Sequence, residues 1–70
     1  MNEAQMRTWG RLAHPTALSE QARIKGPLRD ASVVVAADGT ATVLLYWGDR
    51  IDAVAIDVHG DVVRKTTEML

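Results

Sequence analysis

The feature of this sequence that most constrains its fold is a series of turn signals in its second half. The residue pairs Asp38-Gly39, Gly48-Asp49 and His59-Gly60 each favour a tight turn, and they follow one another at nearly even spacing. The segments between them, residues 31–37, 40–47 and 50–58, are rich in Val, Ile and Leu. Short turns between consecutive strands predict an antiparallel β-meander. Residues 61–67 are expected to form a fourth strand or a frayed end.

The first half of the sequence is typical of helices. Asn2 and Gln5 have the spacing of a capping box, and a helix is predicted to follow with Met6, Trp9, Leu12 and Ala13 on its apolar face. Pro15 disfavours helical backbone at His14 and suits the first turn of a second helix. Gly26-Pro27 is expected to end that helix. One bent helix with a kink at Pro15 is the alternative.

These patterns predict one α+β domain spanning residues 1–70. Its helical segment is residues 1–27, and its antiparallel sheet is residues 31–67. We expect two short N-terminal helices packed on one face of a three- to four-stranded antiparallel β-meander.

The segment Leu44-Leu45-Tyr46-Trp47 lacks the alternation expected of a strand with one solvated face. If each turn has two residues, Leu45 and Trp47 point toward the helices. The opposite face then carries Val33, Val35, Leu44, Tyr46 and Ile51. A one-residue error in register would exchange the faces but leave both apolar. The alternative is that the N-terminal segments wrap around both faces.

Small domains often need a disulfide, a metal or a partner to be stable. The chain has no cysteine and only two histidines, so a partner subunit or target is expected. We predict a homodimer or a complex with another protein, formed through the second sheet face, the helix arginines, or both. The predicted partner-binding residues are Tyr46, Leu44, Ile51, Val33, Val35, Arg7, Arg11 and Arg50.

The net charge of −1 conceals an asymmetry along the chain. Residues 1–29 have five basic and two acidic side chains, whereas residues 30–70 have three basic and seven acidic ones. Arginines on two adjacent helices would suit contacts with phosphates, so a small nucleic-acid-binding regulator is the alternative function. The low isoelectric point and the absence of a third helix argue against it.

Asp57-Val58-His59-Gly60 resembles the first metal-binding motif of calcineurin-like metallophosphoesterases, in which a strand ends in Asp-x-His-Gly. That resemblance implies Asp57 and His59 as metal ligands. The later Gly-Asp and Asn-His motifs of that family have no counterpart in the remaining residues, so a two-metal centre is not expected. A hairpin turn is the simpler interpretation. Asp49, Arg50 and Asp52 are likewise interpreted as charges of an exposed loop.

Taken with the absence of any complete catalytic motif, these features predict a non-enzymatic protein-interaction module that needs no cofactor or metal. The size and build are similar to those of phage or mobile-element inhibitors of host complexes, such as anti-CRISPR proteins, although no motif is shared. The N-terminal residues lack the apolar core of a signal peptide, and no segment is apolar enough to span a membrane. A cytoplasmic protein is expected.

Overall fold

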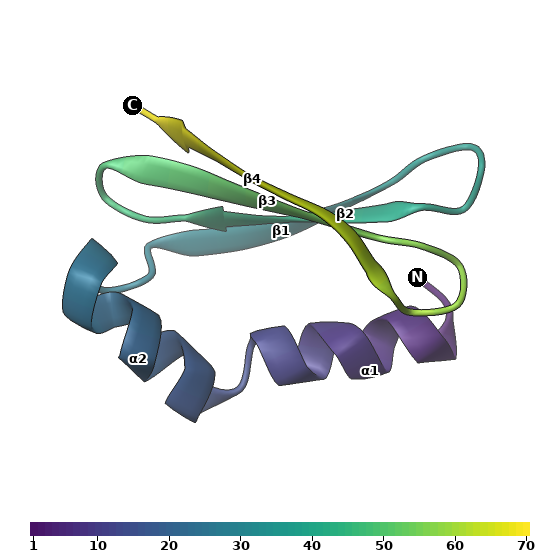
Figure 1. The fold of residues 1–70 in the computed structure, drawn as a ribbon, viewed down its shortest axis with the longest axis horizontal. Coiled ribbons are helices and arrows are strands. Elements are labelled where there is room, and N and C mark those ends of the chain that lie inside the picture. The colour runs from purple at the N-terminus through teal and green to yellow at the C-terminus, as the bar shows by residue number, and fades with distance from the viewer.

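The computed structural model describes residues 1–70 and contains two helices followed by four strands (Figure 1). The helices are α1 (Glu3–Leu12) and α2 (Pro15–Lys25). The strands are β1 (Asp30–Val35), β2 (Ala41–Tyr46), β3 (Arg50–Ile56) and β4 (Val62–Met69). They form one antiparallel sheet in the order β1-β2-β3-β4, which confirms the predicted α+β meander and includes the fourth strand.

The two helices begin at the predicted signals. Asn2 Oδ1 accepts the Gln5 N–H at 2.8 Å, and Gln5 Oε1 accepts the Asn2 N–H at 3.0 Å, so the capping box is present. His14 caps α2 by accepting the Thr16 N–H at Nδ1, and Pro15 is the first residue of α2. The chain therefore forms two separate helices.

Both helices lie along the same face of the sheet, as predicted (Figure 1). The core on this face, called the covered face here, consists of Val43, Leu45, Trp47, Val54 and Ile56. Trp9, Leu12, Leu18 and Ala22 pack against it from the helices. The prediction that Met6 faces the core is wrong, because Met6 is 58% exposed. Gln5 and Thr8 are the buried residues of α1.

Helix α1 is attached to the sheet by polar side chains. Gln5 Nε2 donates to the carbonyl oxygens of Gly39 and Ile56, at 2.8 Å and 3.2 Å. Thr8 Oγ1 donates to the carbonyl oxygen of Gly60. Gly39 and Gly60 lie in the β1–β2 and β3–β4 turns, so α1 joins the two turns at one end of the sheet (Figure 1).

The predicted register is right between β2 and β3 and wrong between β1 and β2. Tyr46 opposes Ile51, as expected for the two-residue turn Gly48-Asp49. Gly48 does not have a positive φ, so this turn is not of type II′. Between β1 and β2, Val33 opposes Val43, which shifts β1 by one residue from the prediction. Val33 and Val35 consequently lie on the covered face.

Hydrogen bonding within the turn explains this shift. The Asp38 carboxylate accepts the Thr40 N–H at 2.9 Å, and no residue other than glycine has a positive φ. A two-residue type I′ turn would need positive φ at both Asp38 and Gly39. Only Gly39 adopts it, at 89°, and the turn consequently contains three residues, 37–39.

The β3–β4 turn is similar, but a β-bulge compensates for its extra residue. Gly60 has a φ of 87°, and Asp57 N–H donates to Asp61 O across a three-residue turn. Ile56 then opposes Val62, whereas Ala55 opposes Arg64. Val63 is therefore the additional residue of the bulge, and from Arg64 onward β4 has the predicted register.

Candidate functional site

The sheet face opposite the helices, called the open face here, has no covering layer (Figure 1). Strand pairing assigns to it Asp30, Ser32, Val34, Thr42, Leu44, Tyr46, Ile51, Ala53, Ala55, Arg64, Thr66 and Glu68. Leu44, Tyr46 and Ile51 are partly exposed, and Val34 is 56% exposed. The predicted apolar second face therefore exists.

A shallow hollow lies in the open face. Leu44, Tyr46, Ile51 and Ala53 provide its apolar floor, and Thr66, Thr67 and Glu68 complete its lining, enclosing about 480 Å³. The apolar residues come from the central strands β2 and β3, whereas the polar ones come from the edge strand β4. An apolar centre with a polar margin is the usual composition of a protein-binding surface.

The structure brings together three of the predicted partner-binding residues and separates the others. Leu44, Tyr46 and Ile51 are neighbours on the open face. Val33 and Val35 lie on the covered side of the exposed edge strand β1, and Val34 takes their place on the open face. The remaining predicted residues, Arg7, Arg11 and Arg50, are not part of the open face.

The three arginines have acceptors within the chain. Arg7 pairs with Glu3 at 3.1 Å, and Arg11 donates to Thr8 Oγ1 at 3.1 Å. Arg50 donates two hydrogen bonds of 2.9 Å to the Asp49 carboxylate. The hydrogen bonds from Arg50 hold the pKa of Asp49 below its ordinary value, so both groups of this exposed turn are charged.

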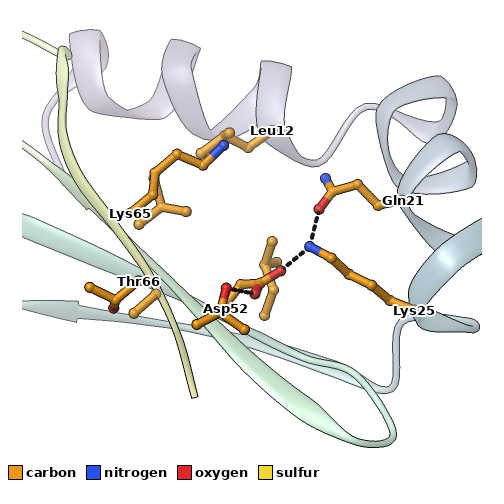
Figure 2. Close-up of a pocket in the computed structure, with 10 residues that line it drawn as sticks. Leu12, Gln21, Lys25, Asp52, Lys65 and Thr66 are labelled. Carbon is orange, nitrogen blue, oxygen red and sulfur yellow. Dashed lines mark hydrogen bonds and ion pairs between the residues drawn. The ribbon is translucent and has the colours of Figure 1, made fainter. Parts of the chain in front are cut away.

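On the covered side, a pocket of about 240 Å³ lies between the helices and the strands β3 and β4 (Figure 2). Lys25 Nζ hydrogen-bonds to the carboxylate of Asp52 and, at 3.0 Å, to Gln21 Oε1. Lys25 also lies 5.3 Å from the centre of the Trp47 ring, within the range of a cation–π interaction. Lys65 lines the same pocket and has no ion-pair partner.

The environment predicted for Asp52 is wrong. Asp52 was expected in an exposed loop, but only 7% of it is exposed, because it opposes Leu45 on the covered face. Its carboxylate accepts hydrogen bonds from Trp47 Nε1 at 2.9 Å and from Thr67 Oγ1 at 2.7 Å. The even spacing of Asp52, Val54 and Ile56 was the signal that could have placed it there.

The pKa of Asp52 is lowered from its ordinary value. Burial alone would raise this pKa, but the hydrogen bonds from Lys25, Thr67 and Trp47 outweigh burial and stabilise the carboxylate. Asp52 is therefore an ionised group whose oxygens are already used. This arrangement fastens α2 to β3 and β4 rather than presenting a free base.

The segment that resembles a metallophosphoesterase motif forms a turn. The Asp57 Oδ1 atom accepts the N–H groups of His59 and Asp61, at 2.9 Å and 3.0 Å. These bonds fix the turn and give Asp57 a local structural role. No group of three or more His, Cys, Asp or Glu side chains is arranged to hold a metal ion.

Comparison with protein-family models, curated proteins and solved structures gives no match for this chain. No helix combines the length and the apolar character needed to cross a membrane.

Proposed function

We propose that this protein is a small non-enzymatic interaction module that binds another protein through the open face. The observation that carries this proposal is the hollow around Tyr46, where three large apolar side chains remain partly exposed on a sheet face that no helix covers. Tyrosine is enriched among residues that dominate binding energy, because it combines a large apolar ring with a polar hydroxyl.

The limited core supports the same proposal. Only 11 of 70 residues are buried, and the edge strands β1 and β4 contribute none of them. A chain with so small a core gains stability when a partner covers its remaining apolar surface.

A quantitative capture experiment tests the proposal. The tagged protein is incubated with lysate of its natural host, and each retained protein is compared between wild type and Tyr46→Ser. We expect the specific partner to bind Tyr46→Ser roughly tenfold more weakly or worse. Ile24→Ser is the matched control, since Ile24 is 80% exposed on α2 and lies away from the open face.

Equal retention by wild type and Tyr46→Ser would contradict the proposal, as would loss of binding by Ile24→Ser alone.

We also propose that binding through the open face inhibits the partner. Purified wild-type protein should then reduce the activity of the captured complex, and Tyr46→Ser should not. The cytoplasm remains the predicted compartment, and imaging of a tagged copy in the host would test it.

A further inference from the structure

The outer edge of β4 is a second unpartnered surface of the molecule. All eight residues of β4 are exposed, and the strand is the last in the sheet order. Unpaired N–H and C=O groups on such an edge are a template for another strand. The residues of β4 indicate which strand would fit.

Backbone hydrogen bonding shows which residues of β4 present their N–H and C=O groups outward. Leu70 N–H donates to Asp49 O at 2.9 Å. Since hydrogen-bonded pairs alternate along an antiparallel ladder, Arg64, Thr66 and Glu68 bond toward β3. The backbone groups of the residues between them, Lys65, Thr67 and Met69, consequently point away from the sheet.

The charges of β4 have no partners inside the chain. Arg64 and Glu68 both lie on the open face of β4, four residues apart, and neither takes part in an ion pair. They lie opposite Ala55 and Ile51, so β3 provides no charge for either side chain. A second protomer can supply an opposite charge for each of them.

We propose that β4 pairs antiparallel with β4 of a second copy about a two-fold axis at Thr66. In this register Arg64 lies opposite Glu68 of the second copy, and Glu68 lies opposite its Arg64. Lys65 lies opposite Thr67, and the exposed Val63 lies opposite the exposed Met69. Every charged residue of β4 thereby meets an opposite charge or a polar group, and apolar residues meet apolar ones.

Other antiparallel registers of β4 lack this complementarity. A two-fold axis at Arg64 or at Lys65 would place two like charges directly opposite each other, which is destabilising. An axis at Thr67 would place Glu68 opposite Thr66 and leave the opposite charges unpaired. The other free edge, β1, has the sequence DASVVV and offers no complementary pair of charges.

The proposed dimer is an eight-stranded antiparallel sheet with a closed two-fold symmetry. Residues that lie opposite each other in a sheet point to the same face, so the two open faces become continuous. Thr66 and Glu68 line the hollow around Tyr46 and also lie in the proposed interface, whereas Arg64 does not line the hollow, so Arg64→Glu tests dimerisation without changing the partner-binding residues.

Sedimentation equilibrium at micromolar concentration tests this register, by comparing the wild-type protein with variants in which the charges of Arg64 and Glu68 are exchanged. We expect a wild-type dimer, and we expect Arg64→Glu and Glu68→Arg each to weaken dimerisation roughly tenfold or more, since like charges then face each other twice. An equimolar mixture of these two variants should form a heterodimer, because opposite charges meet again. The double variant Arg64→Glu/Glu68→Arg should regain the homodimer.

A cysteine at the axis gives a second, independent measurement. The chain has no cysteine, and the two copies of Thr66 form a non-hydrogen-bonded pair in the proposed register. Cα atoms in such a pair are about 4.5 Å apart, which a disulfide bond can span. Thr66→Cys should therefore cross-link on mild oxidation, and Thr42→Cys, in the middle of the open face, should not.

A monomeric wild-type protein at all accessible concentrations would overturn the proposal. It would also be overturned by single charge variants that dimerise as wild type does, or by a mixture that does not restore the dimer. Val34→Lys on β1 is the matched edge control and should leave the dimer intact. Loss of the dimer in that variant alone would assign the interface to β1.

Discussion

The two faces of the sheet show how the same strands serve different purposes. On the covered face, Val43 and Ile56 are completely buried. The carboxylate of Asp52, the acidic group on this face, accepts hydrogen bonds from Lys25, Trp47 and Thr67. On the open face, Leu44, Tyr46 and Ile51 come from the same strands but stay partly exposed. The covered face stabilises the fold, whereas the open face is the surface proposed for partner binding. Substitutions on the two faces should therefore have different effects.

The largest expected effect is on the covered face. Ile56→Ala should lower the free energy of unfolding by about 2–5 kcal/mol, because it leaves a cavity beneath the helices. Ile51→Ala removes the same atoms from the same strand but on the open face, and it should cost less than half as much. Urea denaturation followed by circular dichroism measures both. Equal losses would show that the two faces are equally important for stability.

Asp52→Asn should have the next largest effect, about 1–3 kcal/mol at neutral pH. The folded state lowers the pKa of Asp52 below its ordinary value of 3.8. The stability from the Asp52 carboxylate is therefore complete above that value and is lost as pH falls through the folded-state pKa. Denaturation curves at pH 7 and pH 3 should show a difference between wild type and Asp52→Asn that shrinks in acid. A difference that does not change with pH would contradict this role.

Gln5→Ala should cost about 1–2 kcal/mol, since it leaves the carbonyl groups of Gly39 and Ile56 without their donor. Gln5→Glu is a sharper variant, because it keeps the oxygen that accepts the Asn2 N–H, removes the donors and places a negative charge beside the two carbonyl oxygens. Thermal unfolding should show that Gln5→Glu is at least as destabilising as Gln5→Ala. Wild-type stability in Gln5→Glu would mean that capping is the only role of this side chain.

The smallest effect on stability is expected for Tyr46→Ser, which should cost less than about 1 kcal/mol because Tyr46 is already partly exposed. The same substitution is the one that should weaken partner binding roughly tenfold or more. Measuring its unfolding curve beside the capture experiment separates a binding defect from a folding defect. A large loss of stability would mean that Tyr46 belongs to the core after all.

Local signals in the sequence were sufficient to predict the helices, the strand order and the face that the helices cover. The capping residues around Asn2, the proline at position 15 and the glycines of the turns act through nearby backbone atoms, so a short window contains their whole effect. The β2–β3 register followed from the two-residue turn, which is why Leu45 and Trp47 were assigned correctly to the helices.

The errors have both local and long-range causes. The β1 register depends on whether the Asp38 side chain holds the turn in a three-residue form, and turn-forming pairs alone do not decide this. The period of two along β3 places Asp52 on the covered face, but Lys25, the cation that pairs with its buried carboxylate, is distant in the sequence. Gln5 and Thr8 are buried where they donate hydrogen bonds to carbonyl oxygens of the two turns. The spacing of apolar residues had instead predicted that Met6 faces the core.

The attachment of α1 to both turns has a consequence for the order of folding. The acceptors for Gln5 and Thr8 are carbonyl groups of residues 39, 56 and 60, which come together only when both hairpins have formed. Contacts over such long sequence separation carry a large loop-closure cost, so we expect α1 to dock after the meander. Native-state hydrogen exchange should then show α1 opening at a lower free energy than β2 and β3. Helix α1, which precedes the sheet in the chain, would then become fixed after the sheet.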